Sequence, residues 1–234
     1  MISKEVEKIR QRYLRRENIS NDKRYSFFDK ANLFICQERE RKIIEIFKKN
    51  NFDDLSSKKI LDIGCGTGGW LRNFIQWGAK PENLYGIDLL EKRIDFGRKI
   101  NPNINFICGN AQEINFGSRS FDLVVVATCF TSILDVEMKK DIAREIMRVL
   151  KDDGIVLWYD FRYNNPWNPD VKGVDKKEII ELFGNCDYYF SPVTLAPPIV
   201  RVIAPVSRLI CEVLVKIPFL RTHYLAVIKK KHLK

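Results

Sequence analysis

The residues best suited to carry chemistry form a glycine-rich run that follows the apolar stretch 60–63. Gly64, Gly66 and Gly68 alternate there, and glycine permits both a tight turn and a close approach of the backbone to a ligand. Gly64, Gly66 and Gly69 also satisfy the dinucleotide-binding spacing, which is a weak signal on its own. The run predicts a strand, a ligand-binding turn and the start of a helix.

Two carboxylates favour one kind of ligand at this turn. Asp88 lies 24 residues after Gly64, directly after a second apolar stretch, where a carboxylate accepts hydrogen bonds from the ribose hydroxyls of adenosine. Asp62 precedes Gly64 by two residues, and its charge repels a pyrophosphate but attracts an ammonium or a sulfonium. The polar loop 110–112 suits the edge of an adenine ring. Together these residues favour S-adenosylmethionine over a nicotinamide dinucleotide.

An ordered set of motifs over residues 58–160 carries a family resemblance. Besides the run Asp-x-Gly-x-Gly-x-Gly at 62–68, the set comprises Gly86-Ile87-Asp88, Gly109-Asn110-Ala111, Phe121-Asp122 and the stretch 144–151. In this order the chain resembles the class I S-adenosylmethionine-dependent methyltransferases of the group that acts mainly on small molecules. It departs from their pattern at Asn110, where Asp is commoner. Asp152-Asp153-Gly154 replaces Pro-Gly-Gly and is expected to make the same turn.

The resemblance implies S-adenosylmethionine as the cofactor and a role for each matching segment. The glycine turn with Asp62 would hold the methionyl part, and Asp88 the ribose. Leu89 and loop 110–112 would hold the adenine, and the end of the fourth strand would lie beside the sulfonium. The predicted cofactor-binding residues are Tyr25, Asp62, Gly64, Cys65, Gly66, Thr67, Gly68, Asp88, Leu89, Asn110, Ala111, Gln112, Ala127 and Thr128.

Tyr25 belongs to that set because of its place in an N-terminal segment. Arg24-Tyr25-Ser26-Phe27-Phe28 and Arg39 are expected to fold back over the cofactor as a lid. Helix caps and packing aromatics explain the same residues nearly as well. The segment therefore predicts either a lid or an ordinary structural connection.

The candidate catalytic residues follow the fifth predicted strand. Asp160 and Tyr163 stand where a side chain can take a proton from the acceptor or orient it, while Arg162 suits an anionic group; turn formation explains the loop equally well. Cys129 is interpreted as a buried thiol. The two histidines, 223 and 232, stand near the C-terminus, so no histidine is expected in the body of the domain. Without a metal-ligand cluster, positioning should supply most of the rate and turnover should not need divalent cations.

The elements that must position these residues alternate along the chain. Short apolar stretches separated by helical ones from residue 60 onward predict a Rossmann-like, doubly wound α/β fold, with a mostly parallel seven-stranded sheet and helices on both faces. Residues 1–57 form an N-terminal helical extension or lid, and residues 58–234 the methyltransferase domain. An amphipathic helix is inserted at 198–217, before the last strand, with a kink at Pro205. This helix is expected to cover the substrate crevice or a partner surface, or to pack as ordinary core.

Composition limits the function without fixing the substrate. The chain has 234 residues, 45% of them hydrophobic, and no stretch apolar enough to span a membrane. The charged N-terminus and scattered cysteines predict a cytoplasmic protein with reduced thiols. The net charge of +10 gathers in basic flanks: residues 1–59 carry 16 Lys and Arg against 10 acids, and residues 191–234 carry 8 against 1.

Basic flanks suggest an anionic partner or serve solubility. We expect methyl transfer to oxygen, or less readily nitrogen, of a small or carrier-linked acceptor such as a sugar, a lipid or a secondary metabolite. Peripheral contact with an anionic membrane fits the flanks. Nucleic acid is disfavoured as a partner, and the oligomeric state stays open. An RNA methyltransferase and a non-catalytic binding module of the same fold remain as alternatives.

Overall fold

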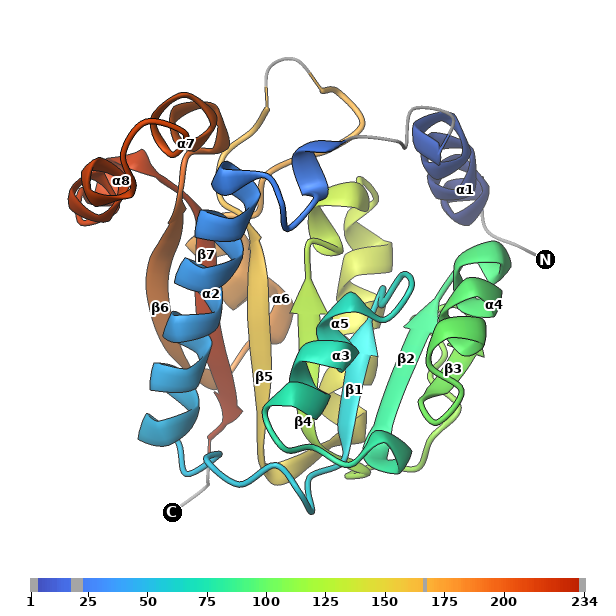
Figure 1. The fold of residues 1–234 in the computed structure, drawn as a ribbon. Coiled ribbons are helices and arrows are strands. Elements are labelled where there is room, and N and C mark those ends of the chain that lie inside the picture. The colour runs from blue at the N-terminus through green and yellow to red at the C-terminus, as the bar shows by residue number, and fades with distance from the viewer. Residues whose placement is uncertain (1–3, 18–22, 166–167, 232–234) are drawn as a thin grey trace.

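A single seven-stranded sheet organises the chain (Figure 1). The computed structural model describes residues 4–17, 23–165 and 168–231. The strand order is β3-β2-β1-β4-β5-β7-β6, and only β7 runs antiparallel, against both of its neighbours. The strands are β1 (Ile60–Ile63), β2 (Leu84–Asp88), β3 (Asn105–Cys108), β4 (Phe121–Ala127), β5 (Leu150–Phe161), β6 (Cys186–Leu195) and β7 (Arg221–Lys230). The order confirms the predicted doubly wound fold.

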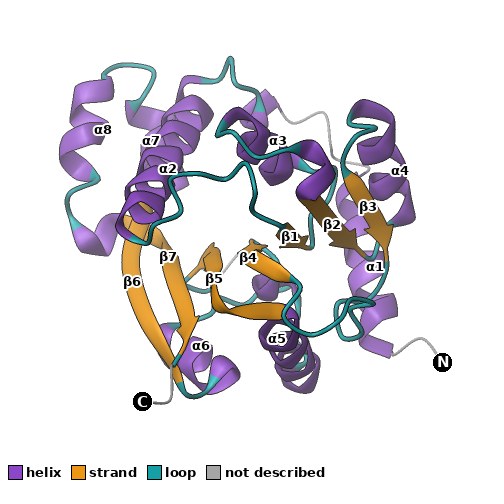
Figure 2. Cartoon of the chain, turned by 90° about the horizontal axis from the view of Figure 1, so that it is seen from below, coloured by secondary structure: helices purple, strands orange, loops and turns teal. Residues whose placement is uncertain are grey.

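Helices cover both faces of the sheet (Figure 2). Every residue of β1 and β4 is buried, as expected for parallel strands with apolar side chains on both faces. One face carries α2 (Lys30–Lys49), α3 (Gly69–Gln76) and α4 (Glu91–Ile100). The other face carries α5 (Val136–Val149) and α6 (Lys176–Phe183), and α1 (Lys4–Glu17) packs on the edge of that side.

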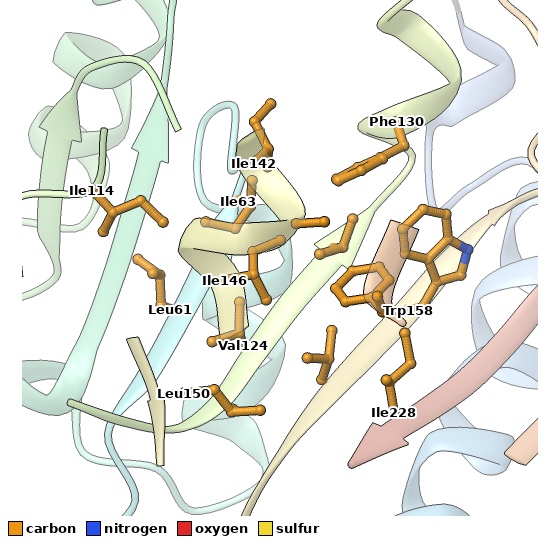
Figure 3. Packing of buried hydrophobic residues seen from close by; sticks show 14 of the residues in the cluster. Leu61, Ile63, Ile114, Val124, Phe130, Ile142, Ile146, Leu150, Trp158 and Ile228 are labelled. Carbon is orange, nitrogen blue, oxygen red and sulfur yellow. The ribbon is translucent and has the colours of Figure 1, made fainter. Parts of the chain in front are cut away.

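Each face has its own hydrophobic core. On the α5 and α6 side, Trp158 contacts Phe130 with ring centroids 4.9 Å apart, and Ile146 lies in the same cluster (Figure 3). On the other side, Phe47 of α2 packs on Phe74 of α3 at 6.2 Å. Because α2 contributes fully buried side chains, it belongs to the same packed body as the sheet.

The late helical insertion consists of two short helices, α7 (Pro197–Ile203) and α8 (Arg208–Leu214), between β6 and β7. Pro205 lies in the turn that separates them, at the predicted kink. Their inner side chains, Val200 and Cys211, pack with Ala31 and Phe34 near the start of α2. The insertion therefore rests on α2 and leaves its other face outside.

One local prediction is wrong. The turn expected at residues 152–154 lies inside β5, because that strand begins at Leu150. The β4–β5 pairing shifts its register there, from Phe121 opposite Leu150 to Leu123 opposite Ile155. A bulge absorbs the extra residues, so the Asp-Gly sequence bends the strand without ending it.

Candidate active site

The turn after β1 is built from glycines in left-handed backbone conformations. Gly64, Gly66 and Gly68 have φ values of +71°, +55° and +79°. A Cβ atom at Gly64 would lie 2.8 Å from Cys129 Sγ, and one at Gly68 would lie 2.6 Å from the Phe106 ring. Backbone conformation and space both require glycine at these two positions.

Asp88 holds the turn from the end of the neighbouring strand. Its carboxylate accepts hydrogen bonds from the backbone N–H groups of Gly66 and Leu90, both at 2.9 Å. The backbone N–H of Gly64 also donates to Ile87 O at 2.8 Å. The glycine turn and the end of β2 are therefore a single hydrogen-bonded unit, and Asp88 keeps further lone pairs for a ligand.

Asp62 is a buried carboxylate without a partner among the described residues. Its side chain lies under the glycine turn with 1% of its surface exposed, and neither oxygen accepts a hydrogen bond there. Burial, and to a lesser degree the charge of Asp88, raises the pKa of the Asp62 carboxyl well above its ordinary value. A buried acceptor pair of this kind is costly unless a ligand supplies the donors.

A cavity lies at the carboxyl ends of the strands, beside these groups. About 590 Å³ of space there is not filled by atoms, and part of that space is open solvent. Six of the predicted residues meet in its wall: Gly64, Asp88, Leu89, Asn110, Ala111 and Thr128. Position and lining are those expected for a ligand site of an open α/β sheet.

Comparison with known proteins gives the family. Residues 60–154 match the family described as "Methyltransferase domain". The chain is 26% identical over 134 residues to a phthiotriol/phenolphthiotriol dimycocerosates methyltransferase of Mycobacterium tuberculosis and 28% identical over 137 residues to a demethylmenaquinone methyltransferase of Lactococcus lactis. These matches cover 54% and 56% of this chain but 47% and 53% of the relatives, so the chain spans about half their length.

Among solved structures, a SAM-dependent methyltransferase of Methanosarcina mazei shares the fold with a TM-score of 0.58 at 19% identity, over 80% of this chain and 98% of that one. Residues 60–154 thus match a methyltransferase family, and the fold is shared with S-adenosylmethionine-dependent methyltransferases. The fold class predicted from the sequence is confirmed, and the predicted family and cofactor agree with these matches.

The residues present in this methyltransferase fit the cofactor. Asp62 offers two oxygens without a partner among the described residues, which would suit the ammonium of the methionyl part. Asp88 lies in the cavity wall with lone pairs left for ribose hydroxyls, and Leu89 and Ala111 offer apolar surface for adenine. Asn110 is fixed in the wall because its Oδ1 accepts from the backbone N–H of Gln112 at 3.0 Å.

Other predicted residues lie outside the cavity wall. Gln112 turns away, and its Nε2 donates to Asp141 Oδ2 at 2.9 Å. Gly66 and Thr67 line a separate open depression beside α4. Tyr25 is 72% exposed and is not in the wall, so its placement gives no support to a lid made by residues 24–28. The remaining predicted residues, Asp62, Cys65, Gly68 and Ala127, are buried and do not line the cavity.

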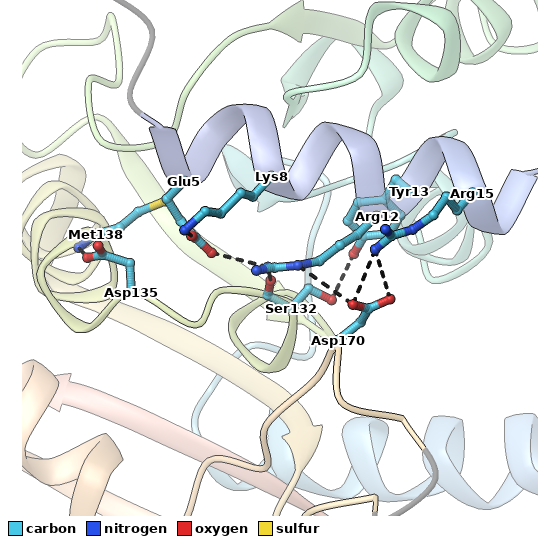
Figure 4. A network of polar contacts seen from close by, with 9 residues as sticks. All are labelled: Glu5, Lys8, Arg12, Tyr13, Arg15, Ser132, Asp135, Met138 and Asp170. Carbon is cyan, nitrogen blue, oxygen red and sulfur yellow. Dashed lines mark hydrogen bonds and ion pairs between the residues drawn. The ribbon is translucent and has the colours of Figure 1, made fainter.

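The N-terminal segment that does reach the cavity is α1, through Ile9 and Tyr13. Figure 4 shows how polar contacts fasten this helix: Tyr13 Oη donates to Ser132 Oγ at 3.0 Å, and Arg12 donates to Ser132 O at 3.2 Å and to Glu5 at 3.1 Å. Arg15 pairs with Asp170 at 3.4 Å. Residues 1–57 were predicted as a helical extension or lid, but nothing in the sequence singled out α1 as the part that lines the cavity.

Thr128 closes the end of β4 in an unusual conformation. Its φ of +49° is left-handed, which is rare for a β-branched residue, and its backbone N–H donates to Tyr159 O at 2.7 Å. Such strain is maintained only where the surrounding structure enforces it, commonly at a functional site. Cys129 beside it is half-buried and lines the cavity, and desolvation raises the pKa of its thiol.

A second group of side chains, which we call the aromatic cluster, stands at the same edge on the α2 and α3 side. Trp70, Tyr159, Phe161 and His223 form it: Tyr159 lies 5.6 Å from Trp70 and stacks on His223 at 4.7 Å, and Phe161 lies 3.9 Å from His223. Arg39 of α2 places its guanidinium 4.8 Å from the Trp70 centroid and 5.4 Å from that of Tyr159.

His223 corrects the expectation that the body of the domain lacks histidine. Antiparallel β7 sets it opposite Phe161 of β5, and 3% of its surface is exposed. Burial, with a smaller contribution from Arg39, lowers the pKa of His223 to about 3, so the imidazole is neutral at physiological pH. The Nε atom of Arg39 is buried without a hydrogen-bond partner among the described residues.

The two predicted catalytic residues occupy different environments. Asp160 is fully buried, and its carboxylate accepts hydrogen bonds from Thr131 N at 3.1 Å, Thr131 Oγ1 at 2.8 Å and Phe161 N at 2.9 Å. Burial raises the pKa of Asp160 to about 6 in spite of these bonds. Tyr163 is 48% exposed, and its hydroxyl accepts a hydrogen bond from Arg162. Neither residue is in the cavity wall, so a catalytic role for them stays a prediction.

Proposed function

We propose that this chain transfers a methyl group from S-adenosylmethionine to a hydroxyl oxygen, or less readily a nitrogen, of an apolar, lipid-type small molecule. The buried Asp62 carboxylate carries the proposal. It directly precedes the cavity residues Ile63 and Gly64, and neither of its oxygens has a partner among the described residues, so it can accept hydrogen bonds from a cationic cofactor. The names of two relatives support the acceptor class, because one refers to phthiotriol dimycocerosates and the other to demethylmenaquinone.

The proposed acceptor side also fits an apolar molecule. In the aromatic cluster Phe161 is 37% exposed and Trp70 is half-buried, while Tyr159 and the uncharged His223 are buried. Arg39 adds an N–H donor without a partner among the described residues, which suits an oxygen of the acceptor. A site of aromatic faces with a single fixed donor orients an apolar molecule that carries few polar atoms.

The bound cofactor supplies a methyl group already activated for displacement by its positively charged sulfur. The chain's part is to align the acceptor and to exclude water. Thr128 and the aromatic cluster mark where alignment takes place, at the ends of β4, β5 and β7. Asp160 fixes the turn 130–132 through Thr131, which leads to the cavity residues Ser132 and Ile133.

Transfer of labelled methyl from the cofactor into fractionated cell extract tests the proposal. We expect label in the lipid fraction with the native chain and none above background with Asp62→Asn. Asp153→Asn is the matched control, because Asp153 is exposed at the far end of β5. Label in RNA or protein alone would contradict the acceptor class. Absence of label in every fraction, with cofactor affinity intact, would favour a non-catalytic module.

A further inference from the structure

The insertion between β6 and β7 presents large apolar side chains to solvent. Val202, Val206, Leu209, Val213 and Phe219 are 73%, 84%, 77%, 62% and 72% exposed, and Phe28 at the start of α2 is fully exposed. We call these six residues the α7–α8 face. Scattered exposed apolar residues are normal, but six on two adjacent segments form a patch that marks an interaction surface.

The two segments of this face are fastened together. Lys30 Nζ donates to Pro205 O at 3.2 Å, which ties the start of α2 to the turn between α7 and α8. Beneath the face, Val200 and Cys211 are fully buried against α2, so the opposite side of each helix already has its partner. Because the inner side of each helix is already packed against α2, repacking these helices would not bury the exposed side chains of the α7–α8 face.

Positive charge surrounds the face. Arg201, Arg208 and Lys216 are exposed on the same insertion. Glu212 is the one acid in residues 191–234, and it is already paired with Arg41 at 3.1 Å and Arg208 at 3.5 Å. Apolar side chains bordered by arginine and lysine are the composition of segments that lie in the interface of an anionic bilayer.

Charge also argues against a second copy of this chain as the occupant. In a two-fold dimer the same patch meets itself, so the basic residues of one copy would approach those of the other. An anionic lipid surface instead supplies charge of the opposite sign and an apolar layer for the side chains. None of the described helices is long and apolar enough to cross a membrane, so the contact is with the surface.

We propose that the α7–α8 face docks this methyltransferase on an anionic lipid bilayer. The face lies at the end of the molecule to which the carboxyl ends of β4 and β5 point (Figure 1). Docking there brings the aromatic cluster and the cavity toward the membrane, where an apolar acceptor is dissolved. The inference goes beyond the proposed function, because docking requires no methyl transfer.

Vesicle sedimentation with the full chain tests the proposal. We expect binding to vesicles of phosphatidylcholine with about one third phosphatidylglycerol, weaker binding to phosphatidylcholine alone, and release near 1 M salt, where the Debye length is only about 3 Å. Leu209→Glu should weaken binding at least about tenfold, since it removes an apolar side chain that would insert into the bilayer and adds a charge that anionic lipid repels. Arg201→Gln should weaken it about fivefold.

Ile180→Glu on α6 is the matched control, because Ile180 is also an exposed aliphatic residue but lies on the other face of the sheet. It should bind vesicles as the native chain does, and all variants should keep the native melting temperature. Native protein that ignores anionic vesicles, or Leu209→Glu that binds them unchanged, would overturn the proposal. So would a solution dimer that Leu209→Glu converts to a monomer. Vesicle binding combined with methylation of only water-soluble acceptors would refute the proposed acceptor and leave the docking intact.

Discussion

Asp88 and Gly66 are joined by a hydrogen bond of 2.9 Å between a carboxylate oxygen and a backbone N–H. The bond links the end of β2 to the turn after β1, so the residue expected to hold the ribose also shapes the turn expected to hold the methionyl part. Its second oxygen accepts from Leu90 N, at the start of α4. Asp88 is thus a structural residue as well as the residue predicted to hold the ribose.

Asp88→Ala should weaken binding of S-adenosylmethionine and of its demethylated product. Each charge-assisted hydrogen bond lost costs about 1.5–3 kcal/mol, or roughly ten- to hundredfold in affinity. Calorimetry measures this directly, with NAD as a ligand that the native chain should not bind. An unchanged affinity would show that the ribose lies elsewhere, and tight binding of NAD alone would contradict the predicted cofactor.

Asp62→Asn should separate stability from binding. Because the pKa of Asp62 is raised in the folded state, the fold binds a proton that the unfolded chain releases above its ordinary pKa of about 3.9. Native stability therefore falls as the pH rises from about 4 toward the raised pKa, whereas the Asn variant lacks this contribution. We expect the variant to melt at a higher temperature near pH 7 and to lose cofactor binding.

Proton release provides a second measurement on Asp62. An ammonium group beside the carboxylate favours its charged form, so cofactor binding should expel a proton. Calorimetry in two buffers of different ionisation enthalpy detects that proton in the native chain and in Asp153→Asn. Equal apparent enthalpies in both buffers would show that Asp62 does not meet the cationic end of the cofactor.

The fold could be predicted because the residues that specify each strand and turn are close together in the sequence. Residues 60–63 and 121–127 are apolar on both faces, and only a parallel sheet covered by helices buries such strands. The turn at Gly64 needs glycine for reasons of backbone conformation that the sequence displays directly. The cavity residues Asp88, Asn110 and Thr128 follow from the same sheet, since each stands just after a strand or begins the loop that follows it.

The rest of the site depends on long-range packing. His223 is near the C-terminus in the sequence, yet the antiparallel insertion of β7 beside β5 brings it against Phe161. Nothing local specifies that strand order. Asp160 is a different case, because strand alternation already turns it to the opposite face from Tyr159 and Phe161. The alternation of side chains along the strand therefore already predicts that Asp160 points away from the aromatic cluster.

Arg12→Ala should weaken cofactor binding although Arg12 is not in the cavity wall. The variant loses contacts to Glu5 and to Ser132 O that hold α1 across the cavity. We expect a several-fold loss of affinity through faster dissociation, measured by stopped-flow fluorescence. Gln11→Ala is the control, because Gln11 is exposed and donates a hydrogen bond to Glu7 on the same helix. Equal dissociation rates in both variants would mean that α1 does not retain the cofactor.

Asp160 and Thr131 distinguish positioning from proton transfer. If Asp160 positions the turn 130–132, Thr131→Val removes the bond from Thr131 Oγ1 and Asp160→Asn disturbs the bond from Thr131 N. Both variants should then lower kcat by similar factors, roughly five- to fiftyfold. If Asp160 takes the proton, Asp160→Asn should lower turnover about 10²–10⁴-fold and abolish a pH-rate limb near its pKa of about 6, while Thr131→Val keeps that limb. Burial and the three accepted hydrogen bonds lead us to expect that Asp160 positions the turn.

Tyr163→Phe should change turnover less than about threefold, because its exposed hydroxyl contacts Arg162 outside the cavity. A large loss in that variant alone would move the search for the base to the loop after β5.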